Sequence, residues 1–131
     1  MAEWKLYDYV TSSGTNDFEA WSKTLEKRDR GKLSQKLRML EIAGPNLPPQ
    51  LLAGPIKHYA HIYKIRINGD VALRPLLCTG PISNEEEFTL LKGAIEKDRQ
   101  WIPSDAPTIA STRRLDVIAD SARRCTHVRV K

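Results

Sequence analysis

The stretch IYKIRINGDVALRPLL, residues 62–77, predicts two antiparallel strands joined by a tight turn. A two-residue turn at Asn68-Gly69 is the commonest hairpin connection, and it would place Arg74 on the same side as the isoleucines. A three-residue turn at Asn68-Gly69-Asp70 shifts the register by one residue and reverses this assignment. Burying Arg74 without a partner among isoleucines would cost on the order of several kcal/mol. The three-residue turn is therefore favoured.

The favoured turn predicts a sheet with one apolar side and one basic side. Because successive strand residues point to opposite sides, the apolar side would carry Tyr63, Ile65, Ile67, Val71 and Leu73. The basic side would carry Lys64, Arg66 and Arg74. Pro75 lacks the backbone N–H of a ladder donor, which predicts a bulge or an edge at that point of the second strand.

The residues before this hairpin predict a strand followed by a long helical segment. Residues 4–11 are rich in aromatic and β-branched side chains, which favours a strand. Apolar residues at helical spacing over residues 17–43 predict a helix capped by Asn16 or Asp17. Gly31 either divides this segment into two helices or only weakens one. The other face of the segment carries basic residues, which favours an ordinary solvated surface. They are Lys23, Lys27, Arg28, Arg30, Lys32, Lys36 and Arg38.

The residues after the hairpin predict one more strand and one more helix. Residues 88–95 favour a short strand. A last helix is predicted from Ser104 or Asp105 to about Arg124, because Pro107 is tolerated in a first helical turn. This range leaves residues 125–131 as a tail.

The predicted fold class is α+β. It consists of a small antiparallel sheet, built from the N-terminal strand plus a three-strand meander, with the N-terminal helical segment packed on one face and a C-terminal helix. We expect a single domain over residues 1–131, with a Pro-rich connection at residues 45–57.

The composition restricts the class of protein. The 131 residues include 21 Lys and Arg against 16 Asp and Glu, a net charge of +5 that favours nucleic acid, an anionic surface or an acidic partner. Cys78 and Cys125 are isolated, which predicts a reduced, cytoplasmic compartment and no disulfide scaffold. No apolar run is long enough for a membrane span, and no metal-ligand spacing, P-loop, EF-hand or Ser-His-Asp set occurs. We therefore expect no membrane association, no metal and no small-molecule cofactor.

Three segments resemble motifs of the RelE/ParE superfamily of bacterial and phage toxins, in particular its phage-type HigB-like branch. IYKIRI is similar to the strand motif in which an aromatic residue is followed by Glu or Lys, an apolar residue and Arg. ALRPLL is similar to the next strand, where a second Arg follows the turn. TLLKGAIEKDRQWIPSDAPTIA is similar to the stretch in which a strand runs into His-Gly-Phe, a Lys pair, a Pro and a helix. Here Lys92 stands where the family commonly has His, and Ala94 replaces the aromatic residue.

The resemblance implies a ribosome-dependent mRNA endoribonuclease, the toxin of a type II toxin–antitoxin module. Its partners would be mRNA on the ribosome and an antitoxin protein encoded by an adjacent gene. The implied catalytic residues are Arg66, Arg74, Lys92, Lys97 and His127. The implied RNA-binding residues are Lys57, His58, Lys64 and Arg99.

Metal-free cleavage by attack of a 2′-OH on phosphate requires a base, cations for the phosphorane charge and a proton donor. Arg66 and Arg74 suit the second role because a guanidinium grips two phosphate oxygens. Lys92 or Lys97 would neutralise charge, or act as the base if crowding among cations lowers the pKa of its amine.

Each of these residues also has a simpler interpretation without a catalytic role. The basic residues would equally suit phosphate binding without chemistry. His127 lies in a stretch that also suits a frayed, solvated end, and His61 suits a core or rim position. Trp101 is expected to pack in the core. A non-nuclease, protein-binding member of the same fold, either a gyrase inhibitor or a non-toxic phage protein, is the alternative function.

Overall fold

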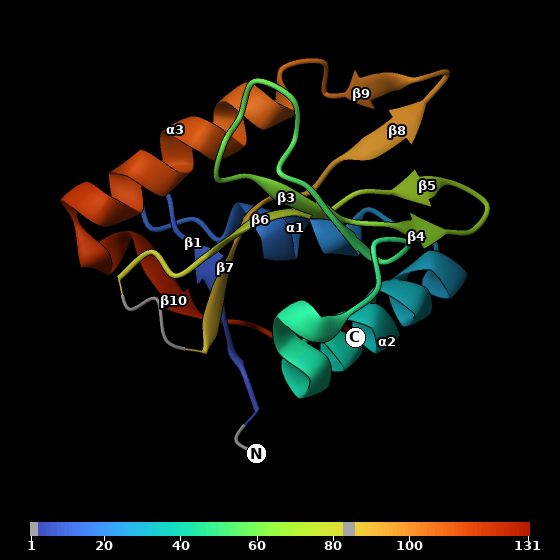
Figure 1. The fold of residues 1–131 in the computed structure, drawn as a ribbon, viewed down its shortest axis with the longest axis horizontal. Helices are drawn as coiled ribbons and strands as arrows, with labels where there is room; N and C mark the ends of the chain where they lie inside the picture. The colour runs from blue at the N-terminus through green and yellow to red at the C-terminus, as the bar shows by residue number, and fades with distance from the viewer. Residues whose placement is uncertain (1–2, 83–85) are drawn as a thin grey trace.

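The computed structural model describes residues 3–82 and 86–131, which form a mixed α+β fold (Figure 1). Within these residues three α-helices accompany two sheets that are rich in antiparallel pairs. The helices are α1 (Asp17–Lys23), α2 (Lys27–Ala43) and α3 (Ala106–Ala119), with 3-10 turns η1 (Gly44–Asn46) and η2 (Ser121–Arg123). The strands are β1 (Lys5–Tyr9), β2 (Leu52–Ala53), β3 (Tyr63–Ile65), β4 (Ile67–Asn68), β5 (Ala72–Leu73), β6 (Leu76–Thr79), β7 (Glu87–Lys92), β8 (Ile95–Lys97), β9 (Gln100–Ile102) and β10 (Arg124–Thr126). No helix within the described residues is long and apolar enough to cross a bilayer.

The expected meander is present, but the sheet is not purely antiparallel. The larger sheet has the order β10-β1-β7-β6-β3-β2, and β1 runs parallel to β7 while the other pairs are antiparallel. A parallel pair needs a long connection, which the helices and the meander between β1 and β7 supply. The smaller sheet, β4-β5-β8-β9, is antiparallel throughout.

The opening hairpin has a three-residue connection, one position further along than predicted. Ile67 pairs with Leu73 and Asn68 with Ala72, so Gly69, Asp70 and Val71 form the connection. The predicted register pairs Ile67 with Val71, whereas the observed partner is Leu73. A shift of two residues does not move side chains to the other side of a strand, so the remaining side chains of the hairpin keep their predicted sides. Val71 is the exception, because it lies in the connection and is exposed rather than on the apolar side. A register shift between Leu76 and Leu77, next to Pro75, agrees with the predicted bulge.

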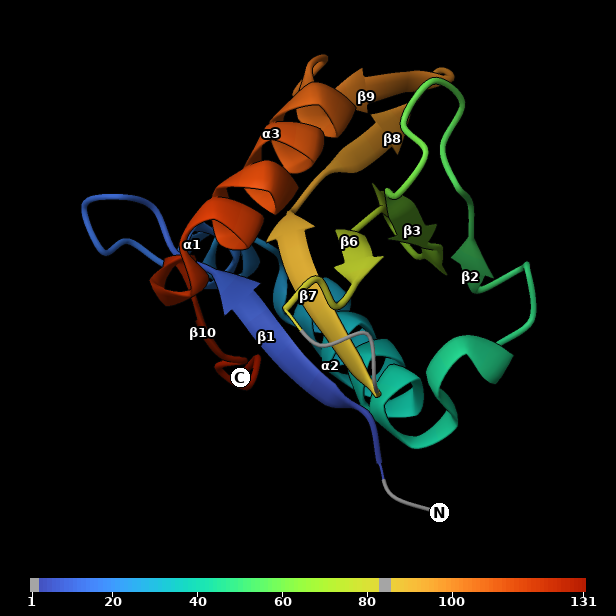
Figure 2. The same ribbon diagram turned by 60° about the vertical axis from the view of Figure 1, so that its left-hand side comes forward.

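Helices cover both faces of the larger sheet (Figure 2). The helices α1 and α2 pack on one face, where the apolar side of the hairpin lies, and α3 packs against β6 and β7 on the other. The core on the α1/α2 side includes the predicted helix stripe and the hairpin side chains Phe18, Leu25, Leu33, Leu37, Leu40, Ile65, Ile67 and Leu73. The basic side of the hairpin therefore shares its face of the sheet with α3.

The N-terminal helical segment is divided at Thr24, not at Gly31. Asn16 caps α1, since its side-chain oxygen accepts a hydrogen bond from the Glu19 N–H at 3.0 Å. At the other end, the Thr24 hydroxyl donates to the Trp21 carbonyl at 2.7 Å and ends the helix. Gly31 lies inside α2 without interrupting it, because its surroundings are open.

The C-terminal third of the chain differs most from the prediction. The strand predicted over residues 88–95 ends at Lys92, and β8 and β9 then form a further hairpin. The last helix ends at Ala119 rather than Arg124, because the Asp120 carboxylate accepts from the Ala122 N–H and turns the chain. Residues 124–126 then pair with β1 as β10, so the first two residues of the predicted tail, 125 and 126, belong to the sheet.

Gly93 is a position where the fold permits no side chain. A Cβ placed there would lie 2.0 Å from Cδ2 of Trp21, so an added methyl group must displace the indole from its packed position. Because overpacking a closed core costs about 1–3 kcal/mol, Gly93→Ala is expected to lower the free energy of unfolding by about 3 kcal/mol. Urea denaturation followed by far-UV circular dichroism measures this change.

Gly31→Ala is the matched control for that substitution. A Cβ at Gly31 meets nothing within 4 Å, and alanine is the better helix former, so we expect the free energy of unfolding to rise by about 1 kcal/mol. Equal stability of the Gly93→Ala and Gly31→Ala variants would contradict the packing of Trp21 on Gly93.

Candidate nucleic-acid interface

Three basic side chains of the hairpin lie together with Glu96 and Trp101 of the β8–β9 hairpin. We refer to this group, Lys64, Arg66, Arg74, Glu96 and Trp101, as the basic face. Lys64 and Arg66 alternate with the buried Ile65, and the pairing of β5 with β8 sets Glu96 opposite Ala72. Glu96 and Trp101 face each other across β8 and β9. The predicted segregation of apolar and basic side chains is thus present.

Arg74 is buried behind the basic face, and its guanidinium is hydrogen-bonded within the protein rather than free. Its Nε lies 2.9 Å from Oε1 of Glu96, and its side chain is only 10% exposed. Its two terminal nitrogens donate to the Leu73 carbonyl at 2.9 Å and to the Asn68 side-chain oxygen at 3.3 Å. All three donating groups of this guanidinium are therefore engaged, and the predicted charge is balanced by a carboxylate.

Lys64 has the unusual electrostatic environment of the basic face. Its Nζ lies 5.3 Å from the centre of the Trp101 ring, a cation–π contact. Burial, followed by the neighbouring cations Arg66 and Arg74, lowers the pKa of the Lys64 amine, while Glu96 acts in the opposite direction. Burial is the largest cause of this shift, so the lowered lysine pKa that a base would need is found at Lys64, a residue predicted only to bind RNA.

Arg66, predicted to be catalytic, and the predicted RNA-binding residues Lys57 and His58 are all exposed. Arg66 is exposed, and no described residue accepts a hydrogen bond from its side chain. Lys57 and His58 are exposed on the loop before β3, whose Tyr59 hydroxyl shares a 2.7 Å hydrogen bond with Thr108 of α3. His61, expected at a core or rim position, is exposed on the same loop.

The predicted residues of the β8–β9 hairpin are exposed but do not share one side. Lys97 is the last residue of β8, and strand alternation directs it away from the side that carries Glu96. Arg99 lies in the two-residue turn with a φ of +63°. Within the described residues of this hairpin, Lys97 and Arg99 are the exposed cations, and Lys97 lies on the side opposite Glu96.

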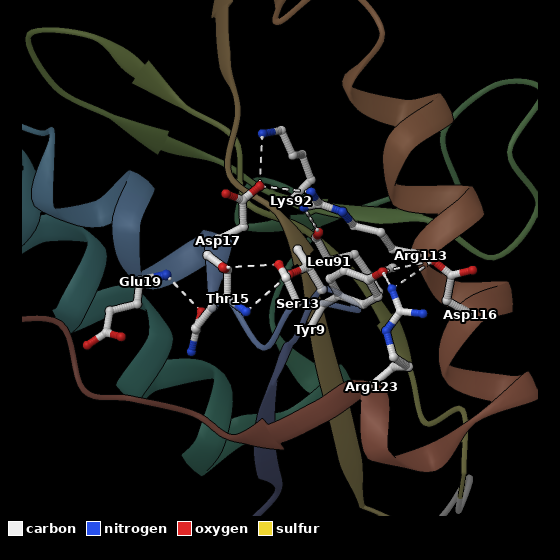
Figure 3. Close-up of polar contacts among 12 residues, drawn as sticks. Tyr9, Ser13, Thr15, Asp17, Glu19, Leu91, Lys92, Arg113, Asp116 and Arg123 are labelled. Atoms are coloured by element: carbon white, nitrogen blue, oxygen red, sulfur yellow. Dashed lines mark hydrogen bonds and ion pairs between the residues drawn. The ribbon is translucent and has the colours of Figure 1, made fainter.

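Lys92 does not join the basic face. Figure 3 shows its ammonium approaching the Asp17 carboxylate, with 3.8 Å between Nζ and Oδ2. Arg113 of α3 reaches the same oxygen at 2.8 Å, and it also donates to the Leu91 carbonyl at 3.0 Å. The hydrogen bond from Arg113, followed by the charge of Lys92, lowers the pKa of Asp17. Lys92 thus belongs to an ion-pair network that ties β7, α1 and α3 together.

This network continues through residues that no sequence motif indicated. The Tyr9 hydroxyl donates to Asp116 at 2.8 Å, and Arg123 contacts both (Figure 3). Burial, and then the bond to Asp116, raises the pKa of Tyr9. The guanidinium carbons of Arg113 and Arg123 lie 4.9 and 5.2 Å from the Tyr9 ring centre. The only sequence signal was the helical spacing of the α3 residues, which does not identify a tyrosine over 100 residues away.

His127, also predicted to be catalytic, lies apart from both the basic face and Lys92. Its Nδ1 shares a 2.7 Å hydrogen bond with Oδ1 of the fully buried Asp8. The other Asp8 oxygen accepts from Asn16 at 2.8 Å and from the Val128 N–H at 2.9 Å. The His127 side chain is only 5% exposed, so the interpretation of a frayed, solvated end is wrong. These bonds anchor the chain after β10 to β1.

Comparisons with known protein families, with curated proteins and with solved structures give no match to this chain. Among the described residues, no group of three or more His, Cys, Asp or Glu is arranged to hold a metal ion. The basic face offers the chemistry of its lysine, arginine and glutamate side chains. A lysine with a lowered pKa can accept a proton, and a neighbouring exposed guanidinium can hold a phosphate.

Proposed function

We propose that this chain is the toxin of a type II toxin–antitoxin module, an endoribonuclease that cuts mRNA on the ribosome in the cytoplasm. The observation that carries the proposal is Lys64, whose pKa is lowered on a face that also holds an exposed arginine, Arg66. The resemblance of IYKIRI and ALRPLL to the RelE-type strand motifs adds to it, and so does a meander flanked by helices. An antitoxin encoded by an adjacent gene would cover the basic face with an acidic segment.

The proposed reaction assigns a role to two side chains of the basic face, Lys64 and Arg66. The neutral amine of Lys64 takes the proton of a ribose 2′-OH, and the 2′ oxygen attacks the adjacent phosphorus. Arg66 holds the equatorial oxygens as negative charge develops on the phosphorane. The bond from phosphorus to the 5′ oxygen breaks, and that oxygen takes a proton from solvent. The products are a 2′,3′-cyclic phosphate and a 5′-hydroxyl end.

The ribosome contributes positioning in this proposal. The basic face offers few free cations, since Arg74 is engaged with Glu96. Holding the mRNA in an attack geometry supplies a large part of the rate in such reactions. The isolated chain is therefore expected to be a poor nuclease on free RNA.

Induced expression in bacteria tests the function. Wild-type protein is expected to arrest growth within one generation, with new 5′ ends on cellular mRNA detected by primer extension. Arg66→Ala is expected to relieve the arrest and remove these ends, because it removes the exposed phosphate ligand. Arg28→Ala, an exposed arginine on α2 whose side chain is 73% exposed, is the matched control and should arrest growth like the wild type. Arrest and cleavage that persist in Arg66→Ala would sink the assignment.

One observation favours a second candidate from another class. Arg74 and Lys92, both implied to be catalytic, are paired with carboxylates, as in a surface that binds without chemistry. The chain would then be a protein-binding member of the same fold, such as a gyrase inhibitor or a non-toxic phage protein. Growth arrest accompanied by intact mRNA and an induced DNA-damage response would favour a gyrase inhibitor, and no arrest at all would favour the non-toxic protein.

A further inference from the structure

A cavity of about 460 Å³ lies between α1, α2 and the C-terminal residues, away from the basic face. Its lining is strongly basic: four basic side chains accompany one carboxylate, a net lining charge of +3. The lining residues are Glu19, Ser22, Lys23, Arg30, Val128, Arg129 and Lys131. Its volume falls within the range of about 300–1,000 Å³ typical of small-molecule sites.

The carboxylates near this cavity neutralise only two of its cations. Lys23 lies 3.6 Å from Glu19, and Arg129 forms a bidentate pair with Glu41. No described residue forms an ion pair with Arg30 or Lys131. Two positive charges therefore remain in the lining, the number that one phosphate dianion would balance.

Arg30 carries the second, independent observation. Its Nε is buried, and no described group accepts a hydrogen bond from it. A buried donor without an acceptor is unfavourable, and a guanidinium is the side chain best shaped to bind a phosphate through two parallel hydrogen bonds. Arg30, predicted to lie on a solvated helix surface, is half-buried there, and its Nε is fully covered.

We propose that this cavity binds a phosphate monoester, the dianionic phosphate of a small molecule, through Arg30 and Lys131. The lining contains no aromatic side chain on which a base could stack, so the phosphate supplies the recognition. The site is separate from the proposed cleavage, and Lys64→Met should leave binding unchanged, so the two proposals fail independently.

Isothermal titration calorimetry of the full chain with inorganic phosphate, ribose 5-phosphate and a ten-nucleotide RNA tests the site. Wild-type protein is expected to bind ribose 5-phosphate, and Arg30→Gln to weaken that binding about 10-fold or more, as expected for loss of a charge-assisted pair. Arg28→Gln, the same change two residues away on α2, is the matched control and should bind within about 2-fold of the wild type. Inorganic phosphate binding with the same dependence on Arg30 also supports a dianion site.

The contrary outcomes are equally defined. Ribose 5-phosphate that does not bind, or that binds Arg30→Gln and wild type alike, overturns the proposal. Dependence on Arg30 for RNA alone would show a polynucleotide surface and likewise overturn it. If Arg30→Gln fails to fold by circular dichroism, Lys131→Ala, which alters an exposed residue, replaces it with an expected weakening of about 5-fold.

Discussion

Under the proposed function, replacing Lys64 with methionine is expected to slow cleavage of ribosome-bound mRNA by about 100-fold or more, because a positioned general base contributes roughly 10²–10⁴-fold. Methionine keeps an unbranched side chain against Trp101, so packing of the basic face is retained while the proton acceptor is lost. Single-turnover cleavage of a defined mRNA in a programmed ribosome measures the effect. A Lys64→Met rate within a factor of about three of the wild type would exclude Lys64 as the base.

Lys64→Arg separates proton transfer from charge. Arginine keeps the cation but does not deprotonate at accessible pH, so we expect mRNA binding to persist while cleavage is lost. Full activity of Lys64→Arg would mean that Lys64 contributes only charge.

The pH dependence of cleavage follows from the groups that set the pKa of Lys64. Because only the neutral amine accepts a proton, the cleavage rate should rise with pH and level off above that lowered pKa. Glu96→Gln removes a charge that raises the pKa, so its profile should shift to lower pH. If Glu96→Gln leaves the pH profile of the cleavage rate unchanged, the titration of Lys64 does not control the rate.

Replacing Glu96 with alanine is expected to lower the free energy of unfolding by about 2–4 kcal/mol, because it leaves the Arg74 guanidinium buried without its carboxylate. The side chains of Arg74 and Glu96 are 10% and 29% exposed, so solvent compensates this charge only in part. Urea denaturation monitored by tryptophan fluorescence measures the change.

The double variant Arg74→Met/Glu96→Leu is the control for that loss. Removing both charges leaves no uncompensated ion, so its stability should return to within about 1 kcal/mol of the wild type. If the double variant is as unstable as Glu96→Ala, the loss of unfolding free energy comes from packing and not from an unpaired buried charge. Cleavage by the double variant would further show whether Arg74 acts only by positioning its neighbours.

Local patterns predicted the two sides of the central hairpin, although its turn lies one position further along and Arg74 is buried against Glu96. The cost of burying Arg74 selected a three-residue connection over the commoner two-residue turn, and Ile65, Ile67 and Leu73 are buried as that choice required. The N-cap at Asn16 and the stripe facing the sheet were also readable, because capping and periodicity are properties of neighbouring residues.

The β8–β9 hairpin was not readable for a local reason. Its turn, Asp98-Arg99, has φ values of +53° and +63°, a conformation for which a glycine or asparagine would have been the signal. The strand β10 could not be predicted for a different reason, because it pairs with β1, a partner over 100 residues away in the sequence.

The candidate site also has one part that local sequence predicts and one part that depends on tertiary packing. Alternation along one strand placed Lys64 and Arg66 together, and this required only the sequence. The separation of Lys92 and His127 from them required the packing of α1 and β1, which supplied the carboxylates of Asp17 and Asp8.

By itself the sequence determined the hairpin, its apolar and basic sides and the helices that cover it, because each depends on residues a few positions apart. Only the tertiary structure decided which cations remain free. Whether a cation is free depends on the positions of carboxylates such as Glu96 and Asp17 in the folded chain. A charge is neutralised by the groups near it in space, and these can lie far away in the sequence.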